Sequence, residues 1–111
     1  MKKKIITEKQ IRNIIQELQS ASDRHDYDFI IKKSENILRD YPDWPEMWLC
    51  CAAAQSESGK NRDACLSQER AVSLCPDNID WLIDFQRYRL QAKVNAQEAI
   101  NKLLELLALY V

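Results

Sequence analysis

The residues of this chain that could do chemistry are its four cysteines and its single histidine. Cys50 and Cys51 are neighbours, and Cys65 and Cys75 follow without forming a CxxC pair or a Cys/His pair at metal-ligand spacing. A zinc site needs such closely spaced ligands. We therefore expect no metal, and we expect the four thiols to be small core residues of a protein in a reducing compartment. An enzyme or metal protein that uses Cys50 and Cys51 is the remaining alternative.

His25 stands between Arg24 and Asp26 in a segment that we expect to be a turn. Nucleophilic catalysis needs a histidine beside a nucleophile and an orienting acid, and phosphate binding needs a glycine-rich loop. With one glycine and one histidine the sequence offers neither arrangement. We interpret His25 as a solvent-facing residue and predict that the protein is not an enzyme and uses no cofactor.

The composition favours one small helical domain. The chain has 111 residues and 13.0 kDa, with a single glycine and three prolines, which leaves little room for hairpins between strands. Its net charge of −1 lacks the basic excess that nucleic-acid binding requires. We expect an all-α protein whose partners are neither nucleic acid nor membrane.

The N-terminal segment begins like a signal peptide but does not continue as one. Lys2–Lys4 precede Ile5 and Ile6, and Glu8 then ends the apolar run, whereas a secretory apolar region needs at least about seven residues. The stretch 103–111 is interrupted by Glu105 and is shorter than the roughly 20 residues that span a bilayer. We therefore expect a cytoplasmic location.

The sequence pattern repeats with a period of about 34 residues, a length that is typical of helical hairpins. Pro76 follows Pro42 by one period, and Ala64 follows Ile30 by the same interval. The period divides the chain into units at about 11–44, 45–78 and 79–111. We expect each unit to be a helical hairpin that buries its apolar face against the next unit.

The middle unit carries a recognisable motif. Its motif residues are Trp48, Cys51, Ala52, Gln55, Gly59, Ala64, Gln68, Ala71 and Pro76. This pattern resembles the tetratricopeptide repeat (TPR). His25 and Lys93 stand at the usual glycine place of the other two units. The resemblance implies a single domain over residues 1–111, in which three stacked helix-turn-helix units form a short right-handed superhelix with a concave groove.

Capping signals delimit the expected helices. We expect helices at about residues 8–22, 27–40, 45–58, 62–75, 79–92 and 96–110. Their start signals are two capping boxes, Thr7 with Gln10 and Asp43 with Glu46, the pair Asp77 and Asn78, and two N-cap residues, Asn61 and Asn95. Pro45 lies inside the first turn of the third helix, where proline is favoured.

The resemblance also implies which residues bind a partner, because the first helix of each unit lines the TPR groove. The groove residues carried over are Arg12, Ile15, Gln19, Glu46, Leu49, Ala53, Ile83, Arg87 and Leu90. Ile15, Leu49 and Ile83 form an apolar column, which is typical of a contact surface or, alternatively, of packing between helices. A carboxylate-binding TPR domain holds its ligand with lysine, asparagine and arginine at groove positions that correspond to Ile15, Gln19, Cys50, Asp80 and Asp84. The two aspartates would repel a carboxylate, so an amphipathic helix is the expected ligand.

The C-terminal helix has more leucines than one neighbouring helix can cover. Leu103, Leu104, Leu107 and Tyr110 are the expected second interface, since residues 103–107 already span more than one turn. The surplus predicts either self-association or a partner that covers this helix.

In length, repeat number and apolar groove the chain resembles the TPR-type chaperones of type III secretion needle subunits in Gram-negative bacteria. That resemblance implies a bacterial cytoplasmic chaperone that holds the amphipathic helix of a needle-type subunit and prevents premature polymerisation, with a small helical co-chaperone on a second surface. The alternatives are a generic TPR adaptor and a homodimeric interaction protein unrelated to secretion.

Overall fold

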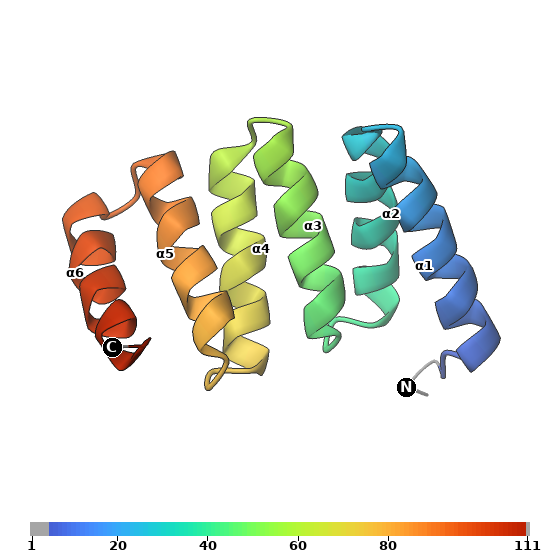
Figure 1. The fold of residues 1–111 in the computed structure, drawn as a ribbon. Coiled ribbons are helices and arrows are strands. Elements are labelled where there is room, and N and C mark those ends of the chain that lie inside the picture. The colour runs from blue at the N-terminus through green and yellow to red at the C-terminus, as the bar shows by residue number, and fades with distance from the viewer. Residues whose placement is uncertain (1–4, 111) are drawn as a thin grey trace.

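The computed structural model describes residues 5–110, which form a row of helices and no strand. The α-helices are α1 (Glu8–Asp23), α2 (Tyr27–Asp40), α3 (Pro45–Glu57), α4 (Asn61–Leu74), α5 (Ile79–Ala92) and α6 (Ala96–Leu107), and the 3₁₀ helix η1 (Ala108–Tyr110) follows. Figure 1 shows them side by side in chain order, each antiparallel to the one before. The predicted all-α class is confirmed over the described residues.

Three helix starts follow from the local sequence. Thr7 and Gln10 form the predicted capping box: the Gln10 backbone N–H donates to Thr7 Oγ1 at 3.2 Å, and the Thr7 N–H donates to Gln10 Oε1 at 2.8 Å. The carboxylate of Asp26 accepts from the N–H of Phe29 at 3.2 Å at the start of α2. The side chain of Asn78 caps α5 in the same way. Each of these side chains satisfies an N–H that the helix leaves without a partner.

Three other predicted helix caps are wrong, although the helices themselves begin within one residue of the predicted positions. Trp44, not Asp43, is the N-cap of α3 and makes no side-chain cap, because Pro45 already begins the helix. Asn61 is the first residue of α4 and Lys60 is its N-cap, because the helix begins one residue earlier than predicted. Asn95 is an N-cap by position, but its left-handed backbone (φ 49°) lacks the extended geometry of a capping residue and its side chain caps nothing. The last α-helix also ends at Leu107, earlier than predicted.

The same turn closes α1, α3 and α5. His25, Gly59 and Lys93 follow one another at the period of the repeat, and all have positive φ values, of 56°, 78° and 58°. The following residue closes each turn through a backbone bond: Asp26 to Ala21 at 2.8 Å, Lys60 to Gln55 at 2.8 Å, and Val94 to Arg89 at 2.9 Å. This is the Schellman arrangement, in which glycine is preferred because it has no Cβ. One conformation therefore recurs with the period of the sequence.

Exchanging residues at this turn should change stability in opposite directions. Lys93→Gly is expected to raise the free energy of unfolding by about 1 kcal/mol, because it removes left-handed strain from a non-glycine residue. Gly59→Ala is expected to lower it by about the same amount, although a Cβ there would meet nothing within 4 Å. Urea denaturation measures both. Lys60→Gly is the control: Lys60 has a φ of −86°, so this change should destabilise, and a gain there would contradict the explanation.

The core is apolar at the N-terminal end of the row and partly polar towards the C-terminal end. Its main cluster runs from α1 to α3 and consists of Leu18, Ala21, Ile30, Ile31, Ile37, Leu38, Met47, Cys51 and Ala54. Between α4 and α5, the buried side chain of Gln68 donates through Nε2 to the carbonyl of Trp81 at 3.0 Å. The buried Arg89 of α5 contacts Glu98 of α6 at 3.1 Å. Directional bonds of this kind fix how the later helices sit on their neighbours.

Candidate functional site

A groove of apolar character lies between α1 and α3, with residues of α2 completing its lining. Its volume is about 830 Å³, and we call it the α1–α3 groove. Its lining consists of Ile11, Ile15, Leu18, Gln19 and Ser22 from α1, Tyr27 and Ile30 from α2, and Trp44, Glu46, Met47, Cys50, Ala53, Ala54 and Glu57 at α3. In Figure 1 the helices α1 and α3 point in the same direction on either side of α2.

Helical spacing brings these residues onto facing surfaces. Ile11, Ile15 and Leu18 recur at steps of three and four, which is one face of a helix. On the other wall, Cys50 and Ala53 are small and exposed, so the middle of the groove stays open. Ile15 is 52% exposed although it is a large apolar side chain. A hollow lined in this way is suited to an apolar surface of another molecule.

Four of the residues carried over from the TPR pattern line this groove: Ile15, Gln19, Glu46 and Ala53. The other five, Arg12, Leu49, Ile83, Arg87 and Leu90, lie outside its lining. Arg87 is paired with Asp84 on its own helix at 2.8 Å. The hydroxyl of Ser56 donates to Oε1 of Gln91 at 3.3 Å, which joins α3 to α5 next to these residues. The hollow therefore lies on the α1 side of α3 and does not extend along α5.

The lining also includes Ile11, Met47 and Ala54, which the sequence did not place in the groove, and Cys50, which stands at one of the groove positions that the TPR resemblance implied. The prediction that Cys50 is a core residue is wrong, because its side chain is exposed on the groove wall. Cys75 is half-buried, and only Cys51 and Cys65 are buried. The helical steps from Glu46 to Cys50 and Ala53 place these three residues on one face of α3.

The thiols differ in environment. Desolvation raises the pKa of Cys50, and the neighbouring Cys51 and the carboxylate of Glu46 raise it further. Burial likewise raises the pKa of Cys51, although hydrogen bonds with Ser34 and Ser67 oppose the shift. No group of three or more potential metal ligands occurs within residues 5–110.

Alkylation should separate the thiols by exposure. In the folded protein iodoacetamide is expected to modify Cys50 first, while Cys51 and Cys65 react only after denaturation. Because the pKa of Cys50 is raised, its thiolate is scarce at neutral pH, and its rate should still be rising as the pH passes the ordinary thiol value of about 8.5. Residue-resolved mass spectrometry between pH 7 and 10 measures this. A rate for Cys50 that levels off below pH 8 would contradict the raised pKa.

A second apolar surface lies on α6. Ile100, Leu104 and Leu107 are 41%, 64% and 49% exposed, and they follow helical spacing along one face. Leu103 is half-buried, and the side chain of Tyr110 lies outside the described residues. In α2, Ile31 and Leu38 are buried, and α2 packs against both α1 and α3. Among the described α-helices, α6 packs only against α5. The exposed leucines therefore lie where a further helix would pack.

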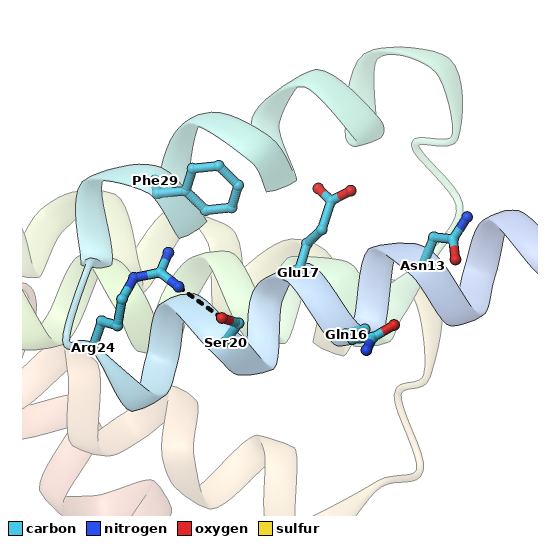
Figure 2. A pocket seen from close by; sticks show the side chains of 6 residues that line it. All are labelled: Asn13, Gln16, Glu17, Ser20, Arg24 and Phe29. Atoms are coloured by element: carbon cyan, nitrogen blue, oxygen red, sulfur yellow. Dashed lines mark hydrogen bonds between the residues drawn. The ribbon is translucent and has the colours of Figure 1, made fainter.

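A second hollow, shown in Figure 2, opens between α1 and α2 on the other side of α1. Its volume is about 550 Å³, and all of its lining residues except Phe29 are polar or charged. The guanidinium of Arg24 donates to Ser20 Oγ at 2.6 Å, and Glu17 is paired with Lys33 at 3.0 Å. These polar groups satisfy one another, so the hollow does not present a set of groups directed at a ligand.

Within residues 5–110, no helix has the length and apolar character needed to cross a membrane. The chain matches no known family model, and no curated protein is significantly similar to it in sequence.

Proposed function

We propose that this protein is a non-catalytic, protein-binding module of the TPR type, which holds an amphipathic helix of a partner in the α1–α3 groove. The TPR assignment is supported by the antiparallel helix row and by the turn that recurs at His25, Gly59 and Lys93. On this proposal the helices form three hairpin units that wind into a short right-handed superhelix. The predicted repeat limits of 11–44, 45–78 and 79–111 then describe one domain.

The observation that carries the binding proposal is the open apolar groove. Ile15 is half-exposed on one wall, and Cys50 and Ala53 leave space on the other. A helix that lays its apolar face into such a groove removes this surface from water, which is the main source of affinity in helix-in-groove recognition. The Cys50 thiol in this lining has a raised pKa, which disfavours the thiolate that nucleophilic catalysis needs.

The more specific proposal is a chaperone for a needle-type subunit of type III secretion, acting in the bacterial cytoplasm. A subunit that polymerises through an apolar helix needs that helix hidden until export. The groove provides one such cover, and the exposed face of α6 provides a second surface on which a small helical co-chaperone would sit. A groove residue and an α6 residue would then contact different partners.

The exposed leucines of α6 also favour a second candidate function. A homodimer formed through Leu104 and Leu107 would cover them without any other protein. In that case the protein is an adaptor that acts as a pair and is unrelated to secretion. The two candidates differ in what covers α6, and the groove proposal is common to both.

The proposal is tested by the reactivity of Cys50 in the complex. The protein is purified from its native cells with whatever remains bound, and alkylation of each cysteine is compared with that of the isolated chain. A helix in the groove should slow alkylation of Cys50 at least tenfold. Cys75, which is half-buried outside the groove lining, serves as the internal control and should react unchanged. A bound partner that leaves Cys50 as reactive as before would overturn the groove proposal.

A further inference from the structure

We propose that the α1–α3 groove selects a helix that carries two basic residues on its groove-facing side, about 11 positions apart, with apolar residues between them. This inference rests on the proposed function, because it specifies the helix that the groove binds. It follows from the position of the carboxylates in the groove.

Within the part of the chain that the structure describes, Glu46 and Glu57 are the only charged residues in the lining. Both are exposed, and neither forms an ion pair within residues 5–110. Arg12 and Arg87, which repeat position would have directed into the groove, lie outside its lining. The groove therefore presents negative charge without a cation among its described lining residues.

The spacing of the two carboxylates matches a helical ligand. Glu46 and Glu57 are separated by a step of 11 on α3, which corresponds to about 1,100° of rotation, or three turns and about 20°. They consequently lie on the same face of α3, separated by about 16 Å along its axis. A ligand helix that follows α3 has residues i and i+11 at the same separation.

Between the carboxylates the groove is neutral. Cys50 and Ala53 form one wall there, and Ile15 and Gln19 form the other. The carboxylate of Glu46 also acts on the Cys50 thiol by raising its pKa, so its charge is felt inside the groove. A helix with apolar residues in its middle turns and lysine or arginine at both ends is complementary to this surface, whereas a helix with acidic ends is repelled. Because each end of the groove carries one carboxylate, the ligand helix can bind either parallel or antiparallel to α3.

The test uses designed amphipathic peptides that share one apolar stripe and are about 18 residues long, which is about five helical turns. They differ only at two positions 11 apart, which are both Lys, both Gln or both Glu. Fluorescence anisotropy measures their affinity for the full chain. At low salt the Lys peptide is expected to bind about tenfold more tightly than the Gln peptide, from two rim pairs worth about two- to fivefold each. The Glu peptide should bind most weakly, and added salt should reduce all differences.

Variants of the protein test whether Glu46 and Glu57 cause the preference for the Lys peptide. In the Glu46→Gln, Glu57→Gln double variant, the Lys and Gln peptides are expected to bind equally. Glu35→Gln removes an exposed carboxylate of α2 that does not line the groove, so the preference for Lys should remain. A peptide of the same composition with one Lys moved to its polar face loses one of the two rim pairs, so its affinity should lie between those of the Lys and Gln peptides. Retention of the full preference in the double variant would overturn the assignment to these two carboxylates.

Failure of this inference can be distinguished from failure of the proposed function. If the Lys and Gln peptides bind the unaltered protein equally, and both protect Cys50 from alkylation, the charge selection is wrong and the groove function stands. If none of the peptides protects Cys50, the groove does not bind helices of this kind, and both proposals are overturned.

Discussion

Replacing Ile15 with glutamate is expected to abolish binding of an amphipathic helix while the protein remains fully helical. Ile15 is 52% exposed in the free protein, so a glutamate there stays hydrated and should cost little folding free energy. In the complex the same carboxylate would be desolvated against apolar side chains without a partner, at a cost of about 2–4 kcal/mol. That corresponds to a loss of affinity of about 30- to 1,000-fold. Circular dichroism and anisotropy with the Lys peptide measure the two effects.

Leu66 provides the matched control for this prediction. It is 62% exposed and lies on α4, outside the α1–α3 groove. Leu66→Glu adds the same charge to a similar surface and should leave the affinity within about twofold. Ala53→Glu, on the opposite wall from Ile15, should reproduce the loss. Binding that survives both groove substitutions would exclude the groove from the mechanism.

The sequence was sufficient for the helices because their limits depend on local chemistry. The Thr7 and Gln10 box, the Asp26 cap and Pro45 in a first turn each act through neighbours within one helical turn. The turn at His25, Gly59 and Lys93 is local too. It tolerates histidine and lysine because the backbone bond that follows holds the left-handed conformation. Asn95 shows the limit of such reasoning, since its residue type favours capping but its backbone prevents it.

The groove was only partly predictable because it depends on how whole helices pack. Repeat position assigned equal roles to Ile15, Leu49 and Ile83. In the structure Ile15 borders the hollow, while Leu49 and Ile83 are half-buried outside its lining. Cys50 joins the groove because one helical step from Glu46 brings it to the same face. Residue periodicity identifies which side chains share a face, but the distance between two facing helices is a property of their contacts.

The exposed leucines of α6 could be predicted only in part from the sequence. Their excess is visible in the sequence, and the structure adds which of them remain uncovered. Ala99 is fully buried, and Leu103 and Leu106 are half-buried, whereas Leu104 and Leu107 face outward. An apolar stripe beside the buried face, at the end of the described helices, is the arrangement expected of a surface that another helix covers.

Substituting Leu104 and Leu107 with glutamine is therefore expected to convert a self-associating chain into a monomer. Complete burial of a leucine contributes about 1.5–3 kcal/mol, and a symmetric dimer buries each residue twice. Loss of the two leucines from both copies should weaken association by several orders of magnitude. Because the side chains are 64% and 49% exposed, the free energy of unfolding of the monomer should change little. Light scattering coupled to size-exclusion chromatography, over a range of protein concentrations, measures the mass.

The controls separate this surface from the groove. Leu66→Gln alters an equally exposed leucine of α4 and should leave the mass of the assembly unchanged. Ile15→Glu should likewise leave the mass unchanged while it abolishes peptide binding, since α1 and α6 lie at opposite ends of the helix row in Figure 1. If a partner occupies α6 in the cell, its addition should replace the self-associated form by a complex of defined size that the double glutamine variant cannot form. An unaltered chain that stays monomeric at high concentration, with no partner present, would show that these leucines do not drive self-association.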